Sequence, residues 1–377
     1  MNRINFLDYT KAIAISFVIA VHVGFYQLNY LLLLVMPAFF IVTGYSFNPD
    51  KRSAKKSIAL RFKSIMIPFW VFMLFYTLIE LIRVQLFGYG TWEILISSLT
   101  NSAYGSGIIP IWGDANEYFK GLMSYKLQGN IGADIILPTN CHLWYLPATF
   151  SGYVVFALIA KRTKKSHLVK LISVVALLSF ASLEVVFPVI CQLPYGIGRG
   201  AIAAAFMLVG YWLRDYGAIG KKNKLFHIIS CLVAAIVSVT AVLLGSDGSA
   251  MVRSYYGPYG AFSVFMTFIG GAAATWLMFE LCRGIDNLKL DSVKRFLSFT
   301  GQNVFIIYLT HMAVKFLFDC IYVLFIAKGS LDVLDGYKMG LMPETSALYM
   351  IFEVVAVIAV CVLLAALKQR IQKKRKI

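Results

Sequence analysis

The sequence predicts an all-α polytopic integral membrane protein, and its composition predicts this class in two ways. Of the 377 residues, 59% are hydrophobic and 14% are charged, whereas a soluble domain has about 45–50% apolar and about 25% charged residues. Aromatic residues make up 15% of the chain, as suits a protein whose rings gather at membrane interfaces. The net charge of +17 is therefore interpreted as a topology signal, and no nucleic-acid partner is expected.

Ten stretches are long and apolar enough to be transmembrane helices, since about 20 such residues cross a bilayer. We treat residues 1–377 as a single membrane domain with a basic tail at 368–377 and a long loop at 88–142. The ten predicted spans are residues 10–26, 28–47, 64–87, 143–160, 168–187, 195–213, 225–244, 261–282, 303–327 and 346–367.

The distribution of Lys and Arg predicts the orientation of the spans. With the N-terminus inside, 25 of the 35 basic residues fall in inside segments and five fall in outside loops. Basic residues accumulate on the cytoplasmic side of membrane proteins. Both termini are therefore predicted to be cytoplasmic, and the protein is expected in a plasma membrane.

The loop at 88–142 is predicted to lie outside and is too long for a plain connector. It contains two tryptophans and several tyrosines. One interpretation is a lid whose rings lie at headgroup depth, and the other is a surface on which a sugar-like acceptor stacks.

The first predicted span contains two ionisable residues that share one helical face. Lys11 and His22 are eleven residues apart, which turns a helix about 20° past three full turns over a rise of about 16 Å. Asp8, three residues before Lys11, lies on nearly the same face. Ionisable groups inside a span are costly and usually functional, so these three residues are candidate catalytic groups.

The ninth predicted span contains a second polar stripe. His311, Lys315 and Asp319 follow each other at intervals of four residues, and the last two can form an ion pair. This stripe either only ties helices together or belongs to a functional site. The other charged residues within or beside spans, such as Arg199 and Glu353, are expected to form structural ion pairs or interfacial anchors.

A basic segment precedes the third predicted span. Arg61 and Lys63 follow the basic run at 51–56 and face the predicted cytoplasmic side. Such a cluster binds either lipid headgroups or a phosphorylated cytoplasmic cofactor.

Five stretches of the chain, taken together and in order, resemble the membrane acyltransferase 3 family. The first joins Asp8, Lys11 and His22 in the pattern of that family's first helix. The others are Met36-Pro37-Ala38-Phe39-Phe40-Ile41-Val42-Thr43-Gly44-Tyr45, the basic segment from Arg61 to Pro68, His142-Leu143-Trp144-Tyr145-Leu146, and the segment from Gly301 to His311.

Three positions depart from the family's pattern. Ser64 stands where a second arginine is common, and Thr43 stands where serine is commoner. Val35 stands where the branch of sugar O-acetylases often has a histidine before Met-Pro. The acceptor therefore differs from that branch, or that histidine is dispensable.

The resemblance implies transfer of an acyl group, usually acetyl from acetyl-CoA, to a hydroxyl of a bacterial cell-envelope or exopolysaccharide glycan. His22 would act as the base or carry the acyl group, with Lys11 and Asp8 beside it. Arg61, Lys63 and Lys11 would bind the CoA. Further candidates are His311, Tyr308, Trp144 and Lys315, and no metal is expected.

Two other classes of function fit an intramembrane His, Lys and Asp. A transporter or flippase of polysaccharide or lipid-linked sugar also uses such residues in proton relays, and it predicts inverted repeats or paired broken helices. A glycan polymerase would use the long outer loop and need no CoA. Binding of a cytoplasmic nucleotide cofactor separates the acyltransferase from both.

Overall fold

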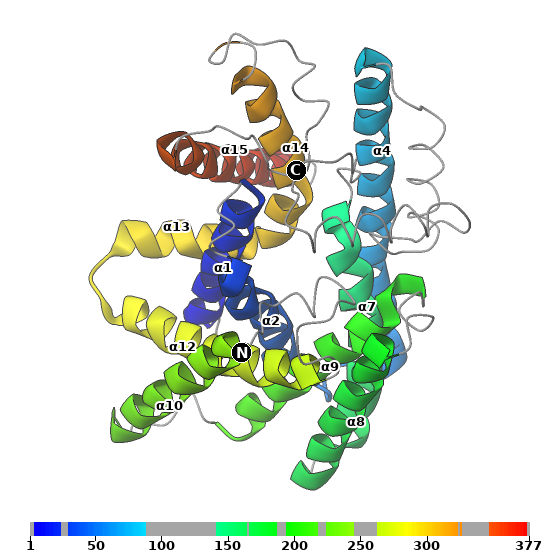
Figure 1. The fold of residues 1–377 in the computed structure, drawn as a ribbon, viewed down its shortest axis with the longest axis vertical. Helices are drawn as coiled ribbons and strands as arrows, with labels where there is room; N and C mark the ends of the chain where they lie inside the picture. Colours follow the sequence, from blue (N-terminus) through cyan, green and yellow to red (C-terminus); the bar gives the residue numbers. More distant parts are fainter. Residues whose placement is uncertain are drawn as a thin grey trace.

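The computed structural model describes residues 4–23, 29–87, 141–163, 166–186, 194–217, 224–244, 262–322, 325 and 347–374, and these form helices with no strand among them. Figure 1 shows the bundle. Its long helices are α1 (Asn5–Val23), α2 (Asn29–Tyr45), α4 (Ile67–Phe87), α7 (Tyr145–Arg162), α8 (His167–Val186), α9 (Ile197–Asp215), α10 (Lys224–Leu243), α12 (Phe262–Asn287), α14 (Val304–Ile321) and α15 (Ala347–Lys374).

Each of the ten predicted spans coincides with one of these helices. Within the described residues, six helices are long and apolar enough to cross a membrane, and two shorter apolar helices accompany them. The multi-pass membrane class is confirmed, whereas ten crossings and cytoplasmic termini remain predictions. The loop at 88–140 lies outside the described residues. Its two interpretations, a lid and a stacking surface, therefore both remain predictions.

Two further helices were not predicted, because their charged residues suggested loops. Helix α3 (Ala54–Arg61) begins after Ser53, whose side chain accepts a hydrogen bond from the Lys56 amide, as an N-cap does. Helix α13 (Asp291–Gln302) has a strongly amphipathic pattern. Between α3 and α4 lies a short π-helix, η2 (Phe62–Met66), and such segments are frequent at functional sites.

Helices α1 and α2 lie at the centre of the bundle, with the other helices around them (Figure 1). The centre is closely packed because glycines let backbones meet. A Cβ atom on Gly44 of α2 would lie 1.8 Å from the Met207 carbonyl oxygen of α9, and one on Gly301 of α13 would lie 1.9 Å from the Asp8 carbonyl oxygen. Small residues at helix interfaces allow this approach in membranes, and it holds α1 rigidly against its neighbours.

Candidate functional site

Two adjoining cavities of about 450 Å³ each lie between α1, α2, α3, η2, α7 and α14. We name them the mouth cavity and the inner cavity. They share the side chains of Thr43, Ser46, Arg61 and Ser64, so they adjoin at these residues, and we call the two cavities together the path. Each volume is within the range of about 300–1,000 Å³ that is typical of small-molecule sites.

The mouth cavity is polar and basic. Lys51, Arg52 and Arg61 all line it. No carboxylate is among the described residues that line either cavity. A site with several cations and no counter-charge suits a polyanion such as a phosphate ester. The mouth cavity is lined by Thr43, Ser46, Phe47, Asn48, Lys51, Arg52, Ser57, Leu60, Arg61, Ser64 and Tyr153.

The inner cavity is mostly apolar. The two cavities are lined by different parts of the same helices: on α7, Tyr153 lines the mouth cavity and Tyr145, eight residues earlier, lines the inner cavity. The lining of the inner cavity comprises Lys11, Val18, Met36, Phe39, Val42, Thr43, Ser46, Arg61, Ser64, Ile65, Tyr145, Leu146, Thr149, Val304, Phe305 and Tyr308.

Arg61 lies at the junction of the two cavities, directly before the π-helix η2. Its guanidinium carbon is 5.0 Å from the centre of the Tyr153 ring, a cation–π contact that orients the side chain. Ser64 of the same π-helix donates a hydrogen bond to the Arg61 carbonyl. This local geometry places a positive charge where the mouth cavity and the inner cavity adjoin.

Lys11 places a second cation on the inner cavity, from α1. Its ammonium group is 2.7 Å from a carboxylate oxygen of Asp8. Asp8 is buried, while Lys11 is about a quarter exposed. The two residues thus share a helical face, as their spacing predicts, and the carboxylate directs the ammonium group of Lys11.

His22 meets His311 beyond the inner cavity. His22 Nδ1 and His311 Nε2 are 3.1 Å apart, and their ring centres are 5.1 Å apart. Val18, one turn before His22 on α1, and Tyr308, one turn before His311 on α14, both line the inner cavity. The histidine pair thus lies one helical turn beyond the cavity.

Hydrogen bonding assigns the tautomers of the histidine pair. His311 Nδ1 is 2.7 Å from the Tyr308 carbonyl oxygen, which can only accept, so Nδ1 carries a proton. With both imidazoles neutral, His311 Nε2 accepts a hydrogen bond from His22 Nδ1. This leaves the lone pair of His22 on Nε2, and a histidine held in one tautomer by a second group has the chemistry that a general base needs.

Aromatic rings connect the inner cavity to the histidine pair. The Tyr308 ring centre is 5.7 Å from that of His311 and 5.5 Å from that of Tyr145. Trp144 is buried, and the guanidinium carbon of Arg199 is 5.2 Å from its ring centre. Tyr308 therefore belongs to the site, whereas Trp144 supports it from behind Tyr145.

The comparison with protein families agrees with this geometry. The family model of the acyltransferase domain, acyltransferase 3, matches residues 4–366. The chain belongs to the acyltransferase 3 family. Neither a curated protein nor a solved structure matches it. The family supports a membrane acyltransferase, and it does not by itself specify a donor or an acceptor.

The structure brings most of the predicted site residues of this acyltransferase together. Lys11, Arg61 and Tyr308 line the cavities, and His22 pairs with His311. Lys63 is exposed and is not among the residues that line either cavity. The described residues contain no group of three or more His, Cys, Asp or Glu that could hold a metal ion.

Sequence reasoning did not select several polar residues that line the path. Thr43, Tyr145 and Tyr153 occur in apolar helices, and Ser46 follows the end of α2. None of these side chains is charged, so no rule about buried charge singled them out. The available signals were the two family-like motifs that contain Thr43 and Tyr145. Their role depends on the rotation of each helix about its axis, which the packing sets.

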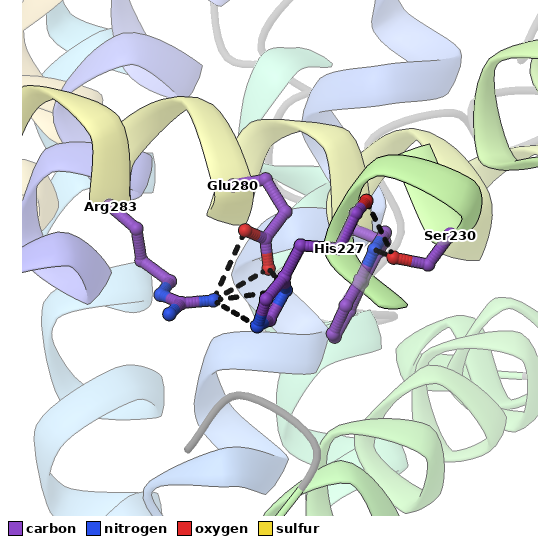
Figure 2. Close-up of polar contacts among 5 residues, drawn as sticks. His227, Ser230, Glu280 and Arg283 are labelled. Carbon is purple, nitrogen blue, oxygen red and sulfur yellow. Dashed lines mark hydrogen bonds and ion pairs between the residues drawn. The ribbon is translucent and has the colours of Figure 1, made fainter. Parts of the chain in front are cut away.

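Two further polar clusters lie outside the cavities of the acyltransferase. On α14 and α15, Lys315 contacts both Asp319 and Glu353, with N–O distances of 2.7 and 3.6 Å. Between α10 and α12, His227, Glu280 and Arg283 form the network of Figure 2. There Glu280 is 3.1 Å from His227 Nδ1 and 2.9 Å from the Arg283 guanidinium.

Proposed function

We propose that this protein is a membrane O-acyltransferase that uses cytoplasmic acyl-CoA. The observation that carries the proposal is the basic mouth cavity adjoining the apolar inner cavity, with the histidine pair one helical turn beyond the inner cavity. Three cations at the mouth suit the phosphates of CoA. The apolar inner cavity suits the uncharged arm that carries the thioester, and acetyl is the acyl group we expect.

The acceptor is proposed to be a hydroxyl of a cell-envelope or exopolysaccharide glycan. The proposal also places the protein in a bacterial inner membrane with the mouth cavity on the cytoplasmic side. The basic residues around the mouth, which the charge distribution predicts to be cytoplasmic, support this orientation. The glycan would then approach the histidine pair from the opposite side.

The proposed reaction uses His22 Nε2 as the base. The acceptor O–H gives its proton to Nε2, the oxygen bonds to the thioester carbonyl carbon, and the C–S bond breaks. The CoA thiolate leaves toward the mouth and takes up a proton from solvent, and His22 later returns its proton to solvent. His311 holds His22 in the reactive tautomer, and general-base assistance contributes about 10²–10⁴ to the rate.

Donor binding tests the proposal without knowledge of the acceptor. Acetyl-CoA at 100 times its Kd should stabilise the purified wild-type protein by about 2.7 kcal/mol, measured as a thermal shift in detergent. Arg61→Ala and Lys11→Ala should lose this shift. Lys63→Ala is the matched control, because Lys63 is a nearby exposed cation that is not among the residues lining either cavity, and it should retain the shift.

The other outcome of this experiment is equally informative. A wild-type protein that acetyl-CoA does not stabilise would contradict the proposal. It would favour a transporter or flippase, or a glycan polymerase, since neither needs a CoA site.

A further inference from the structure

Tyr76 of α4 reaches the turn of α14 that bears His311. Its side chain is fully buried. Its hydroxyl donates a hydrogen bond to the Leu309 carbonyl oxygen, at 2.8 Å, and accepts one from the Ala313 amide, at 3.2 Å. His311 lies midway between these two backbone positions. One hydroxyl from another helix therefore holds both ends of the turn that carries the histidine.

The Tyr76 hydroxyl competes with a backbone hydrogen bond of α14. In a regular α-helix each amide pairs with the carbonyl four residues earlier, so the Ala313 amide would donate to the Leu309 carbonyl. Here both groups bond the same hydroxyl. A side chain that inserts between such groups changes the local course of a helix. The shape of this turn thus depends on a residue of α4.

The shape of the turn decides what the His311 ring can reach. His311 Nδ1 donates to the Tyr308 carbonyl oxygen, at 2.7 Å, within the same turn. That carbonyl precedes the Leu309 carbonyl in the chain, so a shift of the backbone at Leu309 also moves the acceptor of His311. The tautomer of His311 in turn sets that of His22, because His311 Nε2 accepts from His22 Nδ1. The backbone of α14 thus links Tyr76 to both histidines.

A second tyrosine contacts α14 farther along the helix. Tyr349 of α15 donates a hydrogen bond to the Phe318 carbonyl oxygen, at 3.3 Å. Phe318 is seven residues after His311, which is about two helical turns. Tyr76 and Tyr349 therefore make the same kind of contact with one helix, the first at the histidine and the second away from it. Tyr349 is the matched control for Tyr76.

We propose that Tyr76 is a positioning residue for the histidine pair. Its hydroxyl keeps the turn of α14 in the shape in which His311 donates to the Tyr308 carbonyl, and it thereby holds the proton of His311 on Nδ1. The positioning itself stands on the hydrogen bonds of Tyr76 and His311. Its consequence for turnover rests on the proposed acyltransferase function, in which His22 needs its lone pair on Nε2.

The tautomer is measured by solid-state NMR of the ¹⁵N-histidine-labelled protein in lipid vesicles, with no acyl donor present. Protonated and unprotonated ring nitrogens have well-separated ¹⁵N shifts, and His311→Asn identifies the signals of His311. The wild type should show a protonated Nδ1 and an unprotonated Nε2 at His311. Tyr76→Phe should add signals of the other tautomer, because Leu309 and Ala313 then pair directly and the turn closes. Tyr349→Phe should keep the wild-type signals.

Each other result would overturn the positioning role. Unchanged His311 signals in Tyr76→Phe would do so, and so would both tautomers in the wild type or the same change in Tyr349→Phe. A Tyr76→Phe variant without a cooperative thermal transition would also overturn it, because Tyr76 would then hold the whole fold. 3-Fluorotyrosine at position 76 keeps the hydroxyl and should restore the single tautomer. These measurements need no donor, so they fail independently of the proposed function.

The consequence for turnover has a separate readout. Tyr76→Phe should lower kcat by about 10-fold, the lower end of what is typical for groups that orient a reacting histidine, and should leave the KM for acetyl-CoA unchanged. Tyr349→Phe should change neither parameter. A loss in KM alone would contradict the positioning role. A Tyr76→Phe variant with an altered tautomer and wild-type kcat would instead contradict the proposed use of His22 as the base.

Discussion

Two histidines of this protein lie between helices, in opposite chemical settings. Between α10 and α12, His227 contacts Glu280 through Nδ1 and Arg283 through both ring nitrogens. Between α1 and α14, His22 meets the ring of His311, one turn beyond the inner cavity. Both are polar residues in apolar helices, so their sequence context is similar.

The two settings differ in whether a ring nitrogen of the histidine is left without a polar partner among the described residues. Fixed charges engage both nitrogens of His227, so it joins two helices and has no lone pair to offer. The chain of hydrogen bonds from the Tyr308 carbonyl through His311 leaves the lone pair of His22 on Nε2. An intramembrane histidine is thus a candidate base only when its partners leave one nitrogen unoccupied and a cavity lies near it.

The largest expected effect is a loss of acyl-transfer activity when His22, but not His227, is replaced. His22→Asn should lower the turnover of acyl transfer by about 10²–10⁴, because it removes the base. His227→Asn should keep turnover near the wild-type value. Both variants should first show a cooperative thermal transition in detergent. Wild-type turnover in a folded His22→Asn variant would contradict both the contrast between His22 and His227 and the proposed role of His22 as the base.

The second prediction sharpens the role assigned to His311. His311→Asn should lower kcat by about 10- to 100-fold, as is typical for groups that orient a reacting histidine, and should leave the donor KM unchanged. Steady-state kinetics with varied acetyl-CoA measures both parameters. A loss expressed in KM alone would place His311 in donor binding instead.

The third prediction compares two glycines, one where α13 packs on α1 at Asp8 and one on α12 beside Arg283. Gly301→Ala should destabilise the protein by about 1–3 kcal/mol, because its Cβ would lie 1.9 Å from the Asp8 carbonyl oxygen and displace α1. Gly284→Ala, beside Arg283, meets no atom within 4 Å and should stabilise α12 by about 0.5–1 kcal/mol. Thermal unfolding of the two variants tests this, and equal effects would contradict the close packing of α13 on α1.

The smallest expected effect concerns the network beside His227. Ser230→Ala removes the acceptor of a 3.1 Å hydrogen bond from Trp276 Nε1, so it should cost about 1 kcal/mol of stability and leave acyl transfer unchanged. Ser173 of α8, whose hydroxyl bonds the Val169 carbonyl of its own helix, is the matched control. Ser173→Ala should change the free energy of unfolding by less than about 0.5 kcal/mol.

Prediction from sequence succeeded where one helix decides the outcome. The ten long helices follow from apolar length, and the alignment of Lys11 with His22 follows from eleven residues of regular helix. The Asp8–Lys11 and Lys315–Asp319 pairs follow from spacings of three and four residues and are both present. The short α3 and α13 were missed because their charged residues suggested loops.

The amino-acid sequence by itself determined that this is a helical membrane protein with ionisable residues on defined faces, because composition and helical periodicity are local properties of the chain. Only the tertiary structure decided which faces meet. It pairs His22 with His311 across 289 residues, opens the path beside Arg61, and brings Glu353 of α15 to Lys315. These contacts depend on how each helix is rotated against its neighbours, and that rotation is set by side-chain packing across the whole bundle.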